Sequence, residues 1–254
     1  MSGFSPDQPG ADIRVSPNFG PRREPFKPDM IVLHYTGMET GVAAARWLCD
    51  PASEVSSHYL VHEDGGIVQM VRESDRAWHA GKSSWRGQTD INSCSVGIEI
   101  VNPGHGLGYH AFPKRQIAAV ISLCHGVAGR HAIQPERVLA HSDVAPGRKI
   151  DPGEKFPWRQ LAAAGVGHFV DAAPIRRGLT LKAGDAGALV EQLQSMLALY
   201  GYGVDITGVF DRQTEIVVEA FQRHFRPRLV DGIADGSTLR TLRRLLDSAT
   251  TSFV

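Results

Sequence analysis

The stretch "DMIVLHYTG", residues 29–37, carries the clearest structural signal in the sequence. Four apolar residues, Met30–Leu33, include the β-branched Ile31 and Val32 and lead into His34 and a polar turn. A short apolar run of this kind, ended by a turn, predicts a strand buried inside a sheet. His34 lies at the C-terminal end of this strand, where a side chain has a rigid support.

Strand and helix signals alternate on the C-terminal side of this stretch. Pro51 ends a predicted helix over 41–50, and Asp64-Gly65-Gly66 predicts a hairpin turn within 56–71. A further strand is predicted over 95–102 and a long helix over 113–131. The first helix is expected to bury one face, formed by Val42, Ala45, Trp47 and Leu48. Strands and helices mixed in this way indicate an α/β domain.

The composition changes after residue 170. Residues 170–187 are rich in small residues, Gly and Pro, which is typical of a linker, and three amphipathic helical patterns follow. We therefore expect a first domain over 1–172 that includes an irregular N-terminal arm, a linker over 173–180 and a small three-helix bundle over 181–254. A bundle of this size has little room for an internal active site and is expected to bind a partner molecule.

Charge, hydropathy and cysteine content exclude several functional classes. The 254 residues contain 27 Lys plus Arg and 27 Asp plus Glu, a balance that favours neither nucleic acid nor a polybasic membrane contact. No apolar run is long enough to span a bilayer. The first residues, "MSGFSPDQPGAD", lack the features of a secretory signal. Cys49, Cys94 and Cys124 form no CxxC pair and are expected to be free and buried.

The stretch "AHSDVAPGRKIDPG", residues 140–153, concentrates charge on a backbone with no helical or strand period. It contains His141, Asp143, Lys149 and Asp151. Histidine together with carboxylate suits zinc, and a catalytic zinc takes three protein ligands and leaves one position open. His34 is a candidate third ligand. Spacing alone leaves rival sets open among the eleven histidines, such as the pairs His58 with His62 and His105 with His110.

Five segments in order carry a resemblance to a known family. They are "VLHYTG" (32–37), "SSHYLVHEDG" (56–65), "AWHAG" (77–81), "SVGIEIVN" (95–102) and "AHSDVAPGRKIDPG" (140–153). Together they resemble the zinc-dependent N-acetylmuramoyl-L-alanine amidases of the type-2 amidase family, which is related to the peptidoglycan-recognition proteins and to phage amidases. The resemblance covers most of residues 28–160.

The resemblance implies a central mixed β-sheet flanked by helices, with a Zn2+ groove on one face. It implies that His34, His141 and Asp151 hold the zinc and that Glu99 and Lys149 are the catalytic groups beside it. Zinc would polarise the amide carbonyl and activate water, Glu99 would transfer the proton, and Lys149 would stabilise the oxyanion. Asp143 is then expected to brace the loop through backbone N–H groups.

One position departs from part of the wider family. Phage-type members have a tyrosine just before the histidine of the second segment, whereas this chain has Ser57. The acid/base role therefore falls on Glu99. His58, Tyr59, Trp78 and His79 are expected to shape the groove.

The C-terminal bundle resembles the three-helix type of peptidoglycan-binding domain. The shared features lie in "LVEQLQSMLALYGY" (189–202), "TGVFDRQTEIVVEAFQRHF" (207–225) and "DGIADGSTLRTL" (231–242), although Thr207-Gly208 replaces an acidic-Gly turn. Such a domain would raise the local substrate concentration by tethering the enzyme to the wall. The alternative is a structural or dimerisation appendage.

These observations predict hydrolysis of the amide bond between N-acetylmuramic acid, or its anhydro form, and L-alanine in peptidoglycan or muropeptides. The alternatives are a non-catalytic muropeptide-binding protein and a proteinase with the same metal geometry. No protein partner is implied. The missing signal favours a cytoplasmic enzyme that recycles muropeptides, whereas the wall-binding resemblance favours the cell envelope.

Overall fold

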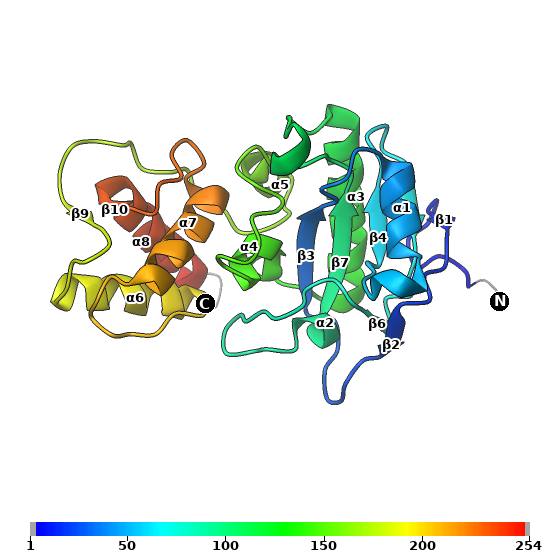
Figure 1. Ribbon diagram of the computed structural model, residues 1–254, viewed down its shortest axis with the longest axis horizontal. Coiled ribbons are helices and arrows are strands. Elements are labelled where there is room, and N and C mark those ends of the chain that lie inside the picture. The colour runs from blue at the N-terminus through cyan, green and yellow to red at the C-terminus, as the bar shows by residue number, and fades with distance from the viewer. Residues whose placement is uncertain (1–3, 252–254) are drawn as a thin grey trace.

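The computed structural model describes residues 4–251 and contains a mixed six-stranded sheet flanked by helices, with further helices packed at one end (Figure 1). The order of strands in the sheet is β1 (Asp12–Ile13), β5 (Ile67–Gln69), β4 (Tyr59–Val61), β7 (Ser95–Ile100), β3 (Met30–Tyr35) and β8 (Val138–Ala140). Two antiparallel pairs lie outside it, formed by β2 (Phe19–Pro21) with β6 (Asp75–Ala77) and by β9 (Thr180–Leu181) with β10 (Ala234–Asp235).

The α-helices are α1 (Gly41–Leu48), α2 (Ile91–Cys94), α3 (Lys114–His131), α4 (His141–Val144), α5 (Trp158–Ala163), α6 (Ala188–Tyr200), α7 (Arg212–Phe225) and α8 (Gly236–Thr251). Three short 3-10 helices are formed by Pro51–Ser53, His105–Leu107 and Pro135–Arg137. The predicted strands over 29–37 and 95–102, the hairpin within 56–71 and the helix over 113–131 are all present.

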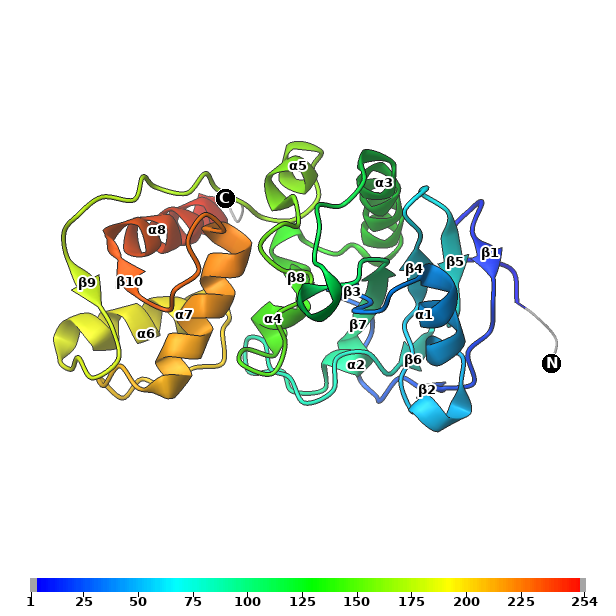
Figure 2. The ribbon, with the colours of Figure 1, turned by 45° about the horizontal axis from the view of Figure 1, so that its top comes forward.

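Four adjacent strands, β4, β7, β3 and β8, run parallel to one another. Parallel strands need crossover connections, and α3 supplies the connection between β7 and β8. Figures 1 and 2 show α1 on one face of the sheet and α3 on the other. Because side chains alternate along a strand, Leu33 and Ile98 pack toward α3, and His34 and Glu99 point to the opposite face.

The predicted apolar face of α1 is wrong in two positions. Val42 is 58% exposed and Trp47 is 50% exposed, whereas Ala44, Ala45 and Leu48 are buried. The buried positions recur at the spacing of one helix face, which neither Val42 nor Trp47 shares with them. Trp47 instead lines a cleft beside the sheet.

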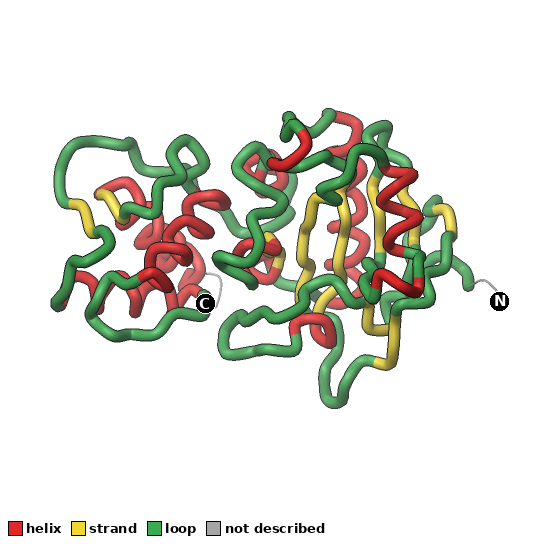
Figure 3. The backbone as a smooth tube through the Cα atoms, viewed as in Figure 1, coloured by secondary structure: helices red, strands yellow, loops and turns green. Residues whose placement is uncertain are grey.

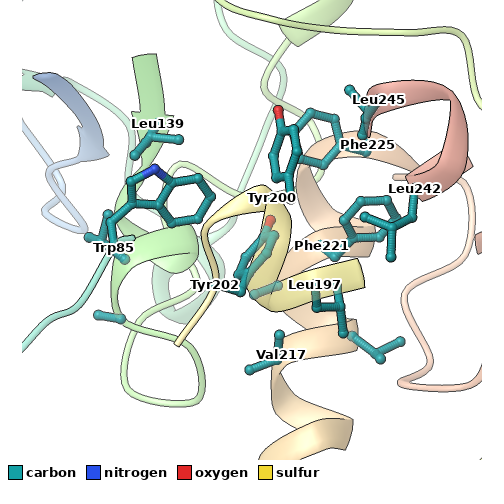
Figure 4. Close-up of a cluster of buried hydrophobic side chains, with 14 of the residues drawn as sticks. Trp85, Leu139, Leu197, Tyr200, Tyr202, Val217, Phe221, Phe225, Leu242 and Leu245 are labelled. Atoms are coloured by element: carbon teal, nitrogen blue, oxygen red, sulfur yellow. The ribbon is translucent and has the colours of Figure 1, made fainter. Parts of the chain in front are cut away.

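The C-terminal helices do not form a separate core. One apolar cluster joins side chains of β3, β8 and the segment that contains Trp85 to those of α6, α7 and α8. Figure 4 shows Trp85 and Leu139 facing Tyr200 and Tyr202. The ring of Trp85 meets that of Tyr202 edge to face at 5.0 Å.

The segment expected to be a linker is held against the bundle. Residues 171–179 form no helix or strand and run as a loop in Figure 3. Ala173 is nevertheless buried, and its backbone hydrogen-bonds to Thr241 and Ser237 of α8. Such contacts restrict the freedom that a tethering linker would have.

Two further expectations concern the described chain as a whole. The three cysteines are free, with Cys94 and Cys124 buried and Cys49 half-buried. Within residues 4–251, no helix combines the length and apolar character that crossing a bilayer requires.

Candidate functional site

The site lies where three parallel strands end. His34 is near the end of β3, Glu99 is near the end of β7, and His141 directly follows β8. The register pairs His34 with Glu99 across β3 and β7, and Leu33 with Ala140 across β3 and β8. These side chains therefore meet at the carboxyl edge of the sheet, the usual position of sites on parallel sheets.

His34, His141 and Asp151 bring one ligand atom each to a common point. His34 Nδ1 is 2.9 Å from His141 Nδ1 and 3.2 Å from Asp151 Oδ2, and His141 Nδ1 is 3.0 Å from Asp151 Oδ2. Ligand atoms of a tetrahedral zinc with bonds of about 2.0 Å lie about 3.3 Å apart. The spacing fits such an ion. Within residues 4–251, this is the single group of three or more His, Cys, Asp or Glu residues arranged to hold a metal.

The hydrogen bonds made by the Nε2 atoms of His34 and His141 decide which ring nitrogens carry protons. Ser95 Oγ donates to the Ile91 carbonyl at 2.5 Å and therefore accepts from His79 Nε2 at 3.1 Å. His79 Nδ1 is then bare and accepts from His34 Nε2 at 3.0 Å, which leaves His34 Nδ1 with a free lone pair.

The same reasoning applies to the second ring. His141 Nε2 lies 3.1 Å from the Ala80 carbonyl, which can only accept, and a neutral ring that donates this bond presents a bare Nδ1. Two lone pairs and a carboxylate oxygen thus face one another. Such an arrangement is repulsive until a cation lies between the three atoms, and the donor set therefore fits a metal ion.

Burial keeps the site in this charge state. Burial lowers the pKa of His34 to about 4, with a further contribution from His141, and it holds the pKa of His79 well below its usual value. The imidazole of His34 is therefore neutral at neutral pH, as metal binding through Nδ1 requires.

Asp143 is fully buried and braces the start of the loop, as expected. Its Oδ2 accepts from the backbone N–H of Ala140 at 2.8 Å. Two partners were not foreseen, because they come from the C-terminal helices and their loops: Tyr202 donates to Oδ1 at 2.7 Å and His224 Nδ1 donates to Oδ2 at 2.7 Å. No local sequence pattern signals contacts over this separation.

Glu99 is the titratable group with the least compensated environment in the site. Its Oε2 is buried without a hydrogen-bond partner among the described residues. Burial raises the pKa of Glu99 well above its usual value, the charge of Asp151 raises it further, and Lys149 opposes the rise. A carboxyl group with a raised pKa holds its proton more readily than an exposed one, which suits a general acid/base.

A cleft of about 350 Å³ opens over these groups. Its lining includes the polar residues Lys149 and Asp151 and the apolar residues Met38, Trp47 and Trp78. Its size and mixed lining are typical of a small-molecule site.

Two residues expected in the groove lie elsewhere. His58 is buried beneath the sheet edge, where it accepts from the Gly97 N–H and contacts Arg22. Tyr59 points to the α3 face and donates to Glu73. Trp78 and His79 do line the cleft. The alternation of strand residues explains the position of Tyr59, since it faces away from Glu99.

Two family models and one curated relative match this chain. Residues 24–154 match the family model "N-acetylmuramoyl-L-alanine amidase", and residues 186–242 match the model "Putative peptidoglycan binding domain". The N-acetylmuramoyl-L-alanine amidase AmiD of Escherichia coli strain K12 is 41% identical over 232 residues, covering 86% of this chain and 82% of the relative.

Solved structures show the same likeness. E. coli AmiD in complex with anhydro-N-acetylmuramic acid-L-Ala-D-gamma-Glu-L-Lys superposes with a TM-score of 0.74 at 36% identity, covering 92% of this chain and 93% of that chain. Pseudomonas aeruginosa AmpDh3 in complex with anhydromuramic pentapeptide gives a TM-score of 0.72 at 29% identity, covering 93% and 96%. The chain therefore belongs to the type-2 family of N-acetylmuramoyl-L-alanine amidases, enzymes that hydrolyse the amide bond between N-acetylmuramic acid and L-alanine.

Proposed function

We propose that this amidase is zinc-dependent, with His34 Nδ1, His141 Nδ1 and Asp151 Oδ2 as the metal ligands. The observation that carries the proposal is the convergence of these three atoms within 2.9–3.2 Å of one another. Zinc, when bound, supplies Lewis-acid polarisation of an amide carbonyl and a more acidic water. Two imidazoles and one carboxylate are a donor set that zinc accepts, with one position left open.

Glu99 is the proposed general acid/base. An unpaired buried carboxylate oxygen beside the ligands can take a proton from the attacking water. Burial raises the pKa of Glu99 and so favours its protonated form, which can pass the proton to the leaving amine of L-alanine. The register partner of His34 is thus the group that moves the proton.

Lys149 is the proposed oxyanion stabiliser. It lines the cleft two residues before Asp151, and its charge is near enough to oppose the rise in the pKa of Glu99. A fixed cation here would lower the energy of a developing negative charge on the carbonyl oxygen.

The substrate class follows from the cleft and the relatives. E. coli AmiD and P. aeruginosa AmpDh3 have been solved with anhydromuramyl peptides. In this chain Trp47 and Trp78, which line the cleft, would receive the sugar, and the stem peptide would extend away from the metal. We therefore infer that the substrate is peptidoglycan or a muropeptide.

The C-terminal region is proposed to bind the wall, with a catalytic domain over 1–172, a linker over 173–180 and a wall-binding domain over 181–254. A cleft of about 620 Å³ lies between the linker and α8 and is lined by Arg176, Arg177 and Arg240. Cationic side chains there match the carboxylates of stem peptides. Because α6–α8 share a core with the sheet, arginine substitutions test this role better than deletion of 175–254.

Product analysis by mass spectrometry tests the proposal, with intact sacculi and soluble anhydro-muropeptides compared side by side. We expect release of stem peptides that begin with L-alanine, in a reaction that chelation stops and zinc restores. Unchanged turnover by the metal-free protein would contradict the metal assignment. A preference for soluble fragments would support muropeptide recycling in the cytoplasm, and a preference for sacculi would support action in the cell envelope.

A further inference from the structure

Apart from Trp78, the motif "AWHAG" (77–81) has no role in the mechanism above, yet two of its other residues lie directly behind the proposed ligands. His79 Nδ1 is 3.0 Å from His34 Nε2, and the Ala80 carbonyl is 3.1 Å from His141 Nε2. Consecutive residues therefore accept one hydrogen bond from each of the two metal-binding rings. Both bonds to the Nε2 atoms therefore come from one dipeptide.

The dipeptide is itself held by the segment that enters β7. The backbone N–H groups of His79 and Ala80 both donate to Asn92 Oδ1, at 3.1 Å and 2.8 Å. Ser95 accepts from His79 Nε2. Asn92 is 8% exposed and Ser95 is fully buried, so water competes little for these bonds.

Packing confines the His79 ring as closely as the hydrogen bonds do. It meets the His34 ring edge to face, with centroids 5.1 Å apart. On its other side lies Gly97, where an added Cβ would come within 2.5 Å of the His79 ring. The strand therefore needs glycine at this position, and the ring has one place to lie.

We propose that the His79–Ala80 dipeptide, fixed by Asn92 and Ser95, orients both histidine ligands and sets the tautomer that presents their Nδ1 atoms to the metal. The inference rests on the proposed metal site. His79 and Asn92 are positioning residues, because they act through His34 and His141. Groups that orient metal-binding histidines contribute about 10–100-fold to metal affinity.

The tautomer gives this proposal its physical content. A neutral imidazole can carry its proton on either nitrogen. The acceptors behind His34 and His141 stabilise the form that is protonated on Nε2. Without the acceptor at His79, the ring of His34 loses both its preferred tautomer and its fixed orientation. Part of the free energy of zinc binding is then spent on restoring them, and the affinity falls.

The test measures zinc affinity of the full chain by competition with a chromophoric chelator, together with the visible spectrum of the Co2+-substituted protein. His79→Ala is expected to raise the zinc Kd about 10–100-fold and to change the Co2+ spectrum. His79→Asn places an acceptor oxygen where Nδ1 lies and is expected to recover most of the affinity. Asn92→Ala should weaken binding and Asn92→Asp, which keeps the acceptor, should recover it.

His58 supplies a matched control, and Ser95 a milder variant. His58 is buried, meets the His79 ring at 5.7 Å and accepts from Gly97, but it contacts neither proposed ligand. His58→Ala should lower thermal stability and leave the zinc Kd unchanged. If His79→Ala does not fold, Ser95→Ala removes the acceptor for His79 Nε2, together with the bond to the Ile91 carbonyl, and should raise the Kd by a few-fold.

The inference is overturned if His79→Ala and Ser95→Ala bind zinc as tightly as the unsubstituted chain, with unchanged Co2+ spectra. Failure of the underlying metal assignment would be seen elsewhere. In that case the unsubstituted chain would bind no zinc, or His34→Ala would bind it equally well.

Discussion

Two regions of this molecule gather buried charged and imidazole groups, and they differ in how far their polar atoms are paired. At the proposed metal site, Glu99 Oε2 has no partner among the described residues and the three proposed ligand atoms face one another. On the α3 side of the sheet, Glu73 is 3% exposed and both of its carboxylate oxygens are fully used.

The Glu73 cluster is a closed network. Arg130 donates to Glu73 through Nε at 3.0 Å and Nη2 at 2.6 Å, and His131 and Tyr59 add bonds of 2.7 Å and 2.6 Å. A buried carboxylate paired in this way supports the fold, whereas an unpaired one costs stability and remains available for chemistry. The comparison predicts opposite consequences for the same kind of substitution in the two regions.

Metal removal should have the largest effect. Chelation is expected to reduce amide hydrolysis to background, because it removes the Lewis acid that would polarise the carbonyl and make the attacking water more acidic. Stoichiometric zinc should restore the rate, as measured by release of L-alanine-terminated peptide. Activity that survives complete demetallation, verified by metal analysis, would remove the distinction between the two regions.

Glu99→Gln should lower kcat about 10²–10⁴-fold, because the amide cannot transfer the proton. The same change replaces an unpaired buried carboxylate with a neutral group, so the melting temperature should stay level or rise. Zinc content should be unchanged. A variant near the wild-type rate would show that another group moves the proton.

Lys149→Met should lower kcat about 10²-fold through loss of charge opposite the developing oxyanion, with a smaller change in KM. Lys149→Arg keeps the charge and should recover part of the rate. Equal losses in both variants would indicate that Lys149 acts through its shape and not through its charge.

Glu73→Gln is the matched partner of Glu99→Gln and should lower stability without lowering activity. It leaves Arg130 and His131 without their carboxylate, so the free energy of unfolding should fall by about 2–3 kcal/mol. This loss is smaller than for a fully buried ion pair, because the side chains of Arg130 and His131 are partly exposed to solvent. The zinc Kd and kcat should remain near those of the unsubstituted enzyme. Loss of activity at full folding would contradict the assignment of this cluster to stability.

The pH dependence of stability sharpens the same contrast. Burial alone would raise the pKa of Glu73, but bonds from His131, Arg130 and Tyr59 lower it from 4.5 to about 2. The stabilisation is therefore fully present above pH 4.5 and is lost as the pH falls toward 2. Denaturant unfolding of the unsubstituted protein and of Glu73→Gln should show that their difference in unfolding free energy shrinks as the pH falls from 4.5 toward 2.

Local patterns were sufficient for most of the fold. The apolar run before His34 and the Asp64-Gly65-Gly66 turn predicted elements that are present. Amphipathic spacing was less reliable where a helix also borders a cleft, as Trp47 on α1 illustrates, because a side chain can be exposed in order to meet a ligand.

The order of motifs in the sequence by itself determined the family and the candidate site residues, since strand ends and turns are encoded locally. Only the tertiary structure decided how they combine. The parallel register set His34 beside Glu99, and bonds between distant segments set His79 behind His34 and His224 on Asp143. Hydrogen-bond direction and burial depend on groups far apart in the chain, and no local period records them.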